Sequence, residues 1–217
     1  MWKNKRYRNC ETPEEPVSGQ TPIFLNIPSR GDEGIPFPQA SIRVVENKIL
    51  FYGEIDENSM LELNRLLMEI DIKLQNTKNS LGDEFDPVCH LHLNTPGGEI
   101  YSALSTVDTI KSLKSKVYTY IDGAVASAGT LISTVGAKRF SGEHGHMLIH
   151  QLSSGMYGKF AEMEDDFYNS KNLMKVLKDF YKKNTKIPMK KLDELLKRDI
   201  WLTAKECLQY GIIDEIR

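Results

Sequence analysis

The sequence predicts an α/β fold with a mainly parallel sheet. Apolar runs of strand length alternate with segments of helical periodicity over most of the chain, and this alternation is typical of parallel sheets with crossover helices. The chain has 217 residues, which is enough for one domain with a sizeable core. We therefore expect a single α/β domain over residues 41–217, preceded by an arm over residues 1–40.

Composition narrows the class of protein. Residues 1–40 are rich in Pro, Gly and charged residues, which is typical of a partly disordered arm, and they hold no apolar segment of the secretory type. The 28 basic and 30 acidic residues give a net charge of −2, so nothing favours a nucleic-acid partner. No run approaches the ~20 apolar residues of a membrane helix. Three distant cysteines indicate a reduced, cytoplasmic location: Cys10, Cys89 and Cys207.

The first half of the domain predicts two strands, each followed by a helix. The strands are the apolar runs Ile49–Tyr52 and Val88–Leu93. The box Ser59-x-x-Glu62 predicts the start of the first helix, and the polar stretch Gln75–Pro87 predicts a loop after it. Apolar residues at helical spacing continue each helix: Leu63, Leu66, Leu67, Ile70 and Leu74 in the first, and Ile100, Ala103, Leu104, Val107 and Ile110 in the second.

The second half predicts the same alternation. A long helix over Lys159–Thr185 carries an apolar face. The box Thr203-x-x-Glu206 starts a short helix that ends at Gly211. The other predicted elements are strands at Val117–Ile121, Met147–Ile149 and Ile212–Ile213, and helices at Ala126–Gly136 and Pro188–Lys197.

Two strand-to-helix junctions contain small residues that packing alone does not require. At the first, Pro96-Gly97-Gly98 lets the backbone turn sharply and leaves N–H groups free at a helix N-terminus, which favours developing negative charge. A tight turn explains the same residues. At the second, Ser127 stands among the small residues of Gly123–Gly129, which expose its hydroxyl much as a nucleophile elbow does. The alternative is a structural N-cap, because serine caps helices well.

A histidine and an aspartate complete a candidate catalytic set. The strand Met147–Ile149 delivers His150 to its C-terminal end, where ligands of parallel sheets gather. A single histidine at such a place is more often structural. A Ser–His pair needs an acid that orients the imidazole. Asp199 is the candidate because it precedes the apolar Ile200–Leu202, where a buried charge would need a partner.

The other four histidines predict no metal site. His90 and His92 alternate with the apolar residues of their strand and are expected to face solvent or a partner. His144 and His146 lie in a Gly-rich turn, without the Cys or carboxylate cluster that a metal site needs. The sequence also lacks the Gly-x-x-x-x-Gly-Lys-[Ser/Thr] phosphate loop, so we expect this chain to bind no cofactor.

In this order and at these spacings, the motifs resemble those of the Clp protease proteolytic subunits, which are serine peptidases with a crotonase-like fold. The resemblance covers residues 41–217 and implies a repeated β-β-α spiral with a mainly parallel sheet and a protruding handle helix over about residues 155–185. The segments that carry it are Glu46–Gly53, Asn94–Gly98, Gly123–Gly129, Met147–Gln151, Arg198–Glu206 and Tyr210–Asp214.

The resemblance implies a role for each matching residue. Ser127 matches the nucleophile, His150 the general base that later protonates the leaving amine, and Asp199 the orienting acid. The backbone N–H groups of Gly98 and Ala128 match the oxyanion hole. Strands that hold an extended substrate by backbone pairing are implied at five further positions: Glu99, Ile100, Leu152, Ser153 and Ser154.

The resemblance also implies an assembly. Two heptameric rings stack face to face into a tetradecamer, with the sites inside a closed chamber and the handle helices between the rings. Arg198 and Glu162 are expected to pair across the rings, and residues 1–40 to be partly disordered or to form axial loops. An AAA+ unfoldase of the Clp type, which binds the ATP, would feed unfolded chains into the chamber. Neither nucleic acid nor a membrane is an expected partner.

Several positions depart from the family pattern, and other functions stay open. Ala128 replaces a common methionine, Leu152 replaces a usual proline, Gln75–Pro87 is long, and residues 1–40 match poorly, which suits a phage-encoded or otherwise specialised member. One alternative is a crotonase-fold enzyme of acyl-CoA thioesters, which needs no Ser-His-Asp set. A second is a Ser-Lys peptidase of the signal-peptide-peptidase type, with a lysine in place of His150. A third is a noncatalytic ring subunit, which typically lacks a triad residue.

Overall fold

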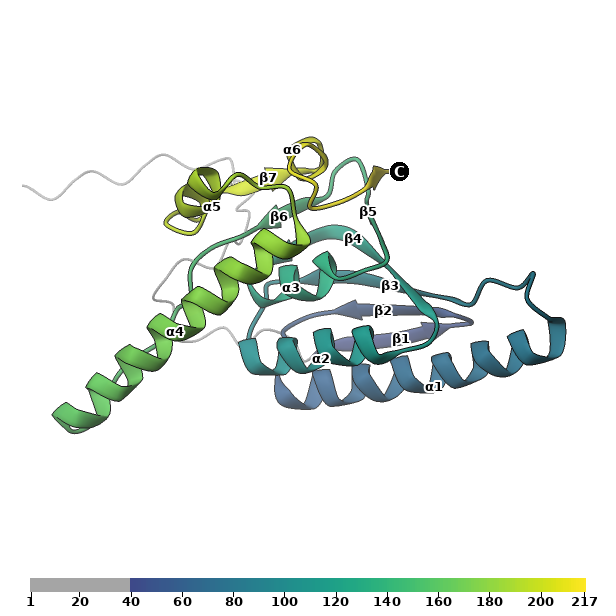
Figure 1. Cartoon of the computed structure of the whole chain (residues 1–217), viewed down its shortest axis with the longest axis horizontal. Coiled ribbons are helices and arrows are strands. Elements are labelled where there is room, and N and C mark those ends of the chain that lie inside the picture. Colours follow the sequence, from purple (N-terminus) through teal and green to yellow (C-terminus); the bar gives the residue numbers. More distant parts are fainter. Residues whose placement is uncertain (1–39) are drawn as a thin grey trace, which may run out of the picture. The chain divides into compact units, whose positions relative to one another are not determined.

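A computed structural model describes residues 40–217, so the predicted arm lies outside the described residues except for its last position. Strands and helices alternate along this part (Figure 1). The strands are β1 (Ser41–Val45), β2 (Lys48–Tyr52), β3 (Val88–Thr95), β4 (Lys116–Ala126), β5 (Lys138–Ser141), β6 (His146–Leu148), β7 (Trp201–Thr203) and β8 (Glu215–Ile216). The helices are α1 (Glu57–Leu81), α2 (Ile100–Ser112), α3 (Ala128–Thr134), α4 (Phe160–Asn184), α5 (Met189–Leu195) and α6 (Ala204–Gln209).

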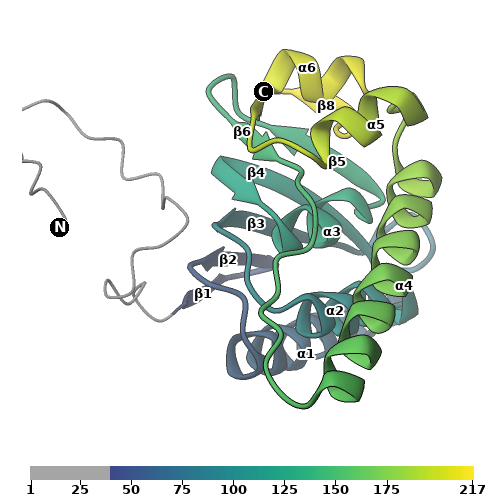
Figure 2. The ribbon, with the colours of Figure 1, turned by 90° about the vertical axis from the view of Figure 1, so that its left-hand side faces the viewer.

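The sheet is mainly parallel, as predicted. Its main path runs β1-β2-β3-β4-β5-β8, and only the β1–β2 pair of that path is antiparallel. The far half of β4 pairs in parallel with β6, which pairs antiparallel with β7. Helices α1 to α4 lie on one side of the strands (Figure 2). The predicted α/β class is therefore confirmed.

The two faces of the sheet differ in side-chain character. In β3, Cys89, Leu91 and Leu93 are fully buried, whereas His90 and His92 alternate with them and are partly exposed. Burial raises the pKa of Cys89 to about 12, so this thiol stays protonated and serves as a small core residue. The helix-covered face thus forms the core, and the predicted placement of both histidines on the opposite face is confirmed.

Helix α1 differs from the sequence prediction at both ends. Its N-cap is Asp56, whose carboxylate accepts from the Ser59 N–H at 2.7 Å while the Ser59 hydroxyl accepts from the Asp56 N–H at 3.0 Å. Ser59 therefore closes the capping box instead of opening it. The helix continues to Leu81, so the predicted loop over Gln75–Pro87 is wrong for its first half. Polarity alone does not end a helix; the chain turns at Gly82, the C-cap.

Helix α4 confirms the predicted handle. It begins after Lys159 and ends before Thr185, and Figure 1 shows its N-terminal part extending away from the sheet. Its apolar residues are buried only toward the C-terminal end, at Leu177 and Tyr181. Three aromatic side chains in the N-terminal half of this helix are largely exposed: Phe160, Phe167 and Tyr168. None of the helices within residues 40–217 is both long and apolar enough to span a membrane.

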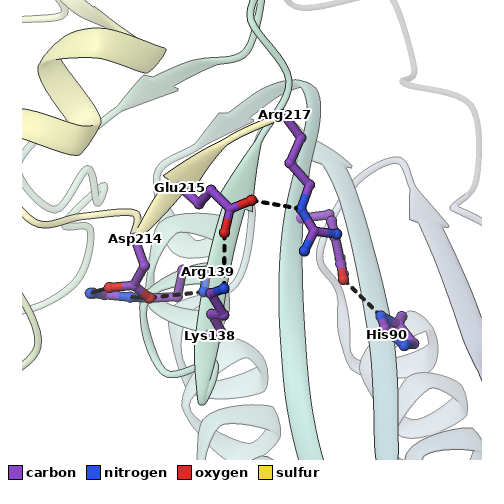
Figure 3. Close-up of polar contacts among 7 residues, drawn as sticks. His90, Lys138, Arg139, Asp214, Glu215 and Arg217 are labelled. Atoms are coloured by element: carbon purple, nitrogen blue, oxygen red, sulfur yellow. Dashed lines mark hydrogen bonds and ion pairs between the residues drawn. The ribbon is translucent and has the colours of Figure 1, made fainter.

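Charged side chains fasten the last strand to β5 (Figure 3). Arg139 donates to both carboxylate oxygens of Asp214, at 3.0 and 2.6 Å, and to the Asn184 carbonyl at the end of α4, at 2.8 Å. These contacts position β8 at Glu215–Ile216. The predicted strand at Ile212–Ile213 is wrong, because these two residues fill the core just before β8.

We expect Arg139→Lys to lower the free energy of unfolding by about 1–2 kcal/mol, because an ammonium cannot reproduce the two-pronged contact and the third bond. The hydrogen bonds from Arg139 lower the pKa of Asp214 below its ordinary value of 3.8. This stabilisation is present above that value and is lost as the pH falls through the folded-state pKa. Urea unfolding of wild type and Arg139→Lys at about pH 7 and about pH 3 measures this. The difference in the free energy of unfolding between the two proteins should be smaller at the lower pH.

Arg65→Lys on α1 is the matched control, because its ion pairs with Glu62 and Glu69 lie on the exposed surface and exposed pairs stabilise little. Equal stabilities of wild type and Arg139→Lys at neutral pH would contradict the assigned role of Arg139.

Candidate active site

Strand register brings two predicted segments together at the C-terminal ends of β3 and β4. Thr95 of β3 faces Val125 of β4 in a parallel pair, so the residues two positions further on, Gly97 and Ser127, also become neighbours. A Cβ built on Gly97 would lie 2.6 Å from the Ser127 Cβ, which is far inside van der Waals contact. Only glycine allows the loop after β3 to approach the serine this closely.

The β6–β7 pair brings the predicted base and acid together. Leu148 faces Trp201 in this antiparallel pair, so His150 and Asp199 lie side by side, two residues beyond the matched positions. The His150 Nδ1 and an Asp199 carboxylate oxygen are 3.0 Å apart. A carboxylate can only accept, so this contact places the ring proton on Nδ1 and leaves Nε2 of the neutral ring as an acceptor.

Asp199 differs from the prediction in its environment. The sequence places it where the chain enters the core, yet its side chain is 71% exposed. Asp199 lies two residues before β7, within the exposed segment of residues 197–200. The pairing with His150 therefore does not arise from the need to neutralise a buried charge.

Ser127 lies on a strained turn between β4 and α3. Its φ of 52° falls in the left-handed region, which is uncommon for residues other than glycine and occurs often at active sites. Its N–H donates to the Leu148 carbonyl at 2.9 Å. Its hydroxyl makes no capping hydrogen bond although the residue occupies the N-cap position of α3, so the structural N-cap alternative does not explain this side chain.

Two backbone N–H groups next to Ser127 are free to bind an anion. The Ile55 N–H donates to the Gly97 carbonyl and the Glu99 N–H donates to the Ile55 carbonyl, both at 2.8 Å. The Gly97 carbonyl and the Glu99 N–H therefore both face Ile55. The Gly98 N–H, which lies between them in the extended loop, faces the opposite side. The N–H of Ala128, in the first turn of α3, is the second group. Neither N–H donates to another residue of the described chain.

These groups share one cavity of about 200 Å³. Ser127, His150, Gly98 and Ala128 all line it, but no hydrogen bond joins the Ser127 hydroxyl to His150 within the described residues. Its apolar walls come from α2, α3, α4 and the segment after β6: Ile100, Leu131, Leu152, Leu177 and Tyr181. No lysine of the described chain lines the cavity, so a Ser-Lys arrangement is not supported.

The predicted substrate strands are not strands in this structure. Glu99 is the N-cap of α2 and Ile100 its first residue, because the helix begins directly after the Gly97–Gly98 turn. The segment Leu152–Ser154 has no regular structure, since no neighbouring strand of the described chain pairs with it. Ile100, Leu152 and Ser153 nevertheless line the cavity, whereas Glu99 does not. Their predicted roles toward a substrate stay predictions.

The sequence prediction missed the contribution of α4 to the cavity. The helix over Lys159–Thr185 was expected to carry an apolar face, yet no residue of that face was assigned to the site, and Leu177 and Tyr181 line the cavity. Their spacing of one helical turn was the available signal. Within its own chain, Glu162 accepts a hydrogen bond from the Lys159 N–H at 2.9 Å. Its pairing with Arg198 of another copy stays a prediction.

Comparison with known proteins identifies similar sequences over nearly the whole described part. The sequence model of the Clp protease family matches residues 43–217. A protein of Streptococcus mutans named ATP-dependent Clp protease proteolytic subunit is 31% identical, over 90% of this chain and 95% of its own. Proteins of the same name are 30% identical in Streptococcus thermophilus, over 90% and 95%, and 29% identical in Deinococcus radiodurans, over 80% and 82%.

Proposed function

Because the chain belongs to the Clp protease family, we propose that it is a serine endopeptidase that cleaves unfolded polypeptides with Ser127, His150 and Asp199. One observation carries this proposal most directly. The cavity is lined by a half-buried serine on a strained turn, a histidine oriented by an aspartate, and two free N–H groups. An acyl-CoA enzyme of the crotonase type would need the N–H groups but no such set of side chains.

In the first half of the reaction, the Ser127 Oγ attacks the carbonyl carbon of the scissile peptide. His150 Nε2 accepts the hydroxyl proton, and Asp199 stabilises the imidazolium that forms. The carbonyl oxygen gains the negative charge of the tetrahedral intermediate and receives hydrogen bonds from the Gly98 and Ala128 N–H groups. His150 then protonates the leaving amine, the C–N bond breaks, and an ester on Ser127 remains.

In the second half, water replaces the amine. His150 accepts a proton from the water, the hydroxide attacks the ester carbonyl, and the Ser127 Oγ leaves with the proton that His150 returns. Serine and histidine must come within hydrogen-bond distance during both halves. Such contacts are often long in an unliganded site and tighten when substrate binds, which accounts for their separation here.

We further propose that copies of this chain assemble into two stacked heptameric rings in the cytoplasm, with a Clp-type AAA+ unfoldase as the ATP-binding partner. The names of the relatives, which describe proteolytic subunits of an ATP-dependent protease, support this. So do the exposed Phe160 and Phe167 on the extending part of α4, since exposed apolar side chains on one helix favour a protein contact.

The experiment that tests the proposal compares three substrates: a short fluorogenic peptide, an unfolded protein, and a folded protein carrying a degradation tag. We expect the purified protein to cleave the peptide without any partner. It should degrade the folded protein only when a Clp-type unfoldase and ATP are added. Absence of cleavage of every substrate, in a sample that native mass spectrometry shows to be fully assembled, would contradict the peptidase. Cleavage of the peptide with no unfoldase dependence would contradict only the proposed partner.

We expect Gly98→Ala to lower kcat by about 10²–10³-fold, the effect of losing one oxyanion donor. A Cβ at Gly98 would come within 2.0 Å of the Ile55 carbonyl oxygen, and its φ of +141° is one that side chains rarely adopt. The loop must therefore move, and the N–H moves with it. Steady-state peptide hydrolysis measures the effect, with the thermal midpoint recorded in parallel.

Gly142→Ala is the matched control, because a Cβ there meets no atom of the described part of the chain within 4 Å. We expect this variant to retain wild-type kcat. A Gly98→Ala protein that folds and keeps wild-type kcat would show that this N–H does not stabilise the oxyanion.

A further inference from the structure

We propose that Tyr181 and Thr130 form a positioning pair that holds the Ser127 turn in its reactive geometry. This inference rests on the proposed peptidase function. It assigns a positioning role to two residues that do not touch the reacting atoms. It begins from the strain at Ser127, whose left-handed backbone persists only where surrounding contacts fix it.

Thr130 supplies two of those contacts. Its N–H donates to the Ser127 carbonyl at 3.0 Å, and its hydroxyl donates to the same carbonyl at 2.6 Å. The two bonds converge on the one peptide oxygen whose position sets the ψ angle of Ser127. Because Thr130 is fully buried, water does not replace either bond.

Tyr181 holds Thr130 in turn. Its hydroxyl lies 2.6 Å from the Thr130 hydroxyl. A carbonyl can only accept, so the single Thr130 hydroxyl proton is committed to the Ser127 carbonyl, and Tyr181 must be the donor in the second bond. The polarity of the relay is therefore fixed, from the Tyr181 O–H through the Thr130 O–H to the Ser127 carbonyl oxygen.

Burial makes this relay costly to break. Tyr181 is 3% exposed, and burial raises the pKa of Tyr181 to about 12, so its hydroxyl keeps the proton that it donates. The two ends of the relay are not equivalent. Loss of the Tyr181 hydroxyl leaves Thr130 with an unused acceptor, whereas loss of the Thr130 hydroxyl strands a buried Tyr181 donor, and stranded donors cost more than lost bonds.

The relay also connects separate parts of the fold. Tyr181 lies near the C-terminal end of α4, and Thr130 lies in the first turn of α3, directly after the Ser127 turn. Backbone hydrogen bonds within either helix do not connect the two. The side-chain relay is thus a direct link between the cavity wall that α4 supplies and the serine.

Four variants test the pair: Tyr181→Phe, Thr130→Val, Thr130→Ser, and the double variant of Tyr181→Phe with Thr130→Val. We expect Tyr181→Phe to lower kcat, and the rate of Ser127 labelling by a fluorophosphonate, about fivefold, the equivalent of one ordinary hydrogen bond. Thr130→Val should lower both roughly thirtyfold, since it removes one bond and strands a donor. Thr130→Ser keeps the hydroxyl and should stay within about twofold of wild type.

The double variant separates positioning from stability. Its thermal midpoint should exceed that of Thr130→Val, because no donor is stranded, while its kcat should stay as low as that of Thr130→Val. KM should change less than kcat in every case, because Thr130 does not line the cavity and Tyr181→Phe keeps the ring that does. Tyr168→Phe is the matched control on the same helix, since Tyr168 is 65% exposed.

The proposal is overturned if Tyr181→Phe and Thr130→Val keep wild-type kcat and labelling rates, or if their losses multiply in the double variant. It is also overturned if kcat of the double variant recovers together with its thermal midpoint relative to Thr130→Val, because the pair then has only a structural role. Failure of the proposed function gives a different result, in which the assembled wild type itself is neither labelled nor active.

Discussion

Ser127→Ala should lower kcat for peptide hydrolysis by roughly 10⁶-fold, the loss typical of removing the nucleophile from a set of groups that act together. Without the Oγ no acyl-enzyme forms, and the remaining groups only bind the peptide and stabilise an oxyanion. The fold should survive, because the Ser127 hydroxyl makes no capping bond and alanine removes one atom. Hydrolysis of a fluorogenic peptide at saturating concentration measures this prediction.

Ser80→Ala is the control, because Ser80 lies in the last turn of α1 and, among residues 40–217, its hydroxyl bonds only to the Asn76 carbonyl. This variant should keep wild-type kcat. If Ser127→Ala retained more than about one per cent of wild-type activity, beyond what the oxyanion donors supply alone, Ser127 would not be the nucleophile.

The second large effect is expected for Asp199→Asn, which should lower kcat by about 10⁴-fold. The 3.0 Å contact with His150 Nδ1 requires a group that accepts. An asparagine can present its NH₂ to Nδ1, which favours the tautomer with the proton on Nε2, and that tautomer cannot accept the serine proton. KM should change little, because Asp199 does not line the cavity.

Asp193→Asn is the matched control for Asp199→Asn. Asp193 lies on α5 and forms an ion pair with Lys178 at 2.6 Å, away from the His150 contact. Its replacement should leave kcat unchanged. If Asp199→Asn lost less than about tenfold, the largely exposed Asp199 would be dispensable, and solvent or another group would orient His150.

The fold class, the segments that line the candidate site and the family were predictable because each has a local sequence signature. Alternating apolar runs predicted the parallel sheet, and small residues around Ser127 and at Gly97–Gly98 marked two strand-to-helix turns. The resemblance of three ordered motifs pointed to the family that the comparison confirms. These features depend on a few neighbouring residues, so the sequence shows them directly.

Features that depend on tertiary contacts were not predictable. The short strands β1, β5 and β7 lack a distinctive pattern, and pairing with neighbours defines them. The polar end of α1 was mistaken for a loop, since good helix formers can also be polar. The exposure of Asp199 and the contact of Tyr181 with Thr130 follow from where β7 and α4 pack, which no local pattern encodes.

The most direct test of the central claim is active-site labelling of the wild type and Ser127→Ala with a fluorophosphonate, followed by intact mass spectrometry. Native mass spectrometry first identifies the assembled fraction, since that is the form proposed to be active. The account predicts one adduct per wild-type chain, located at Ser127 by peptide mapping, and none on Ser127→Ala. An assembled wild type that acquires no adduct, or acquires it at another residue, would contradict the claim that Ser127 is the activated nucleophile.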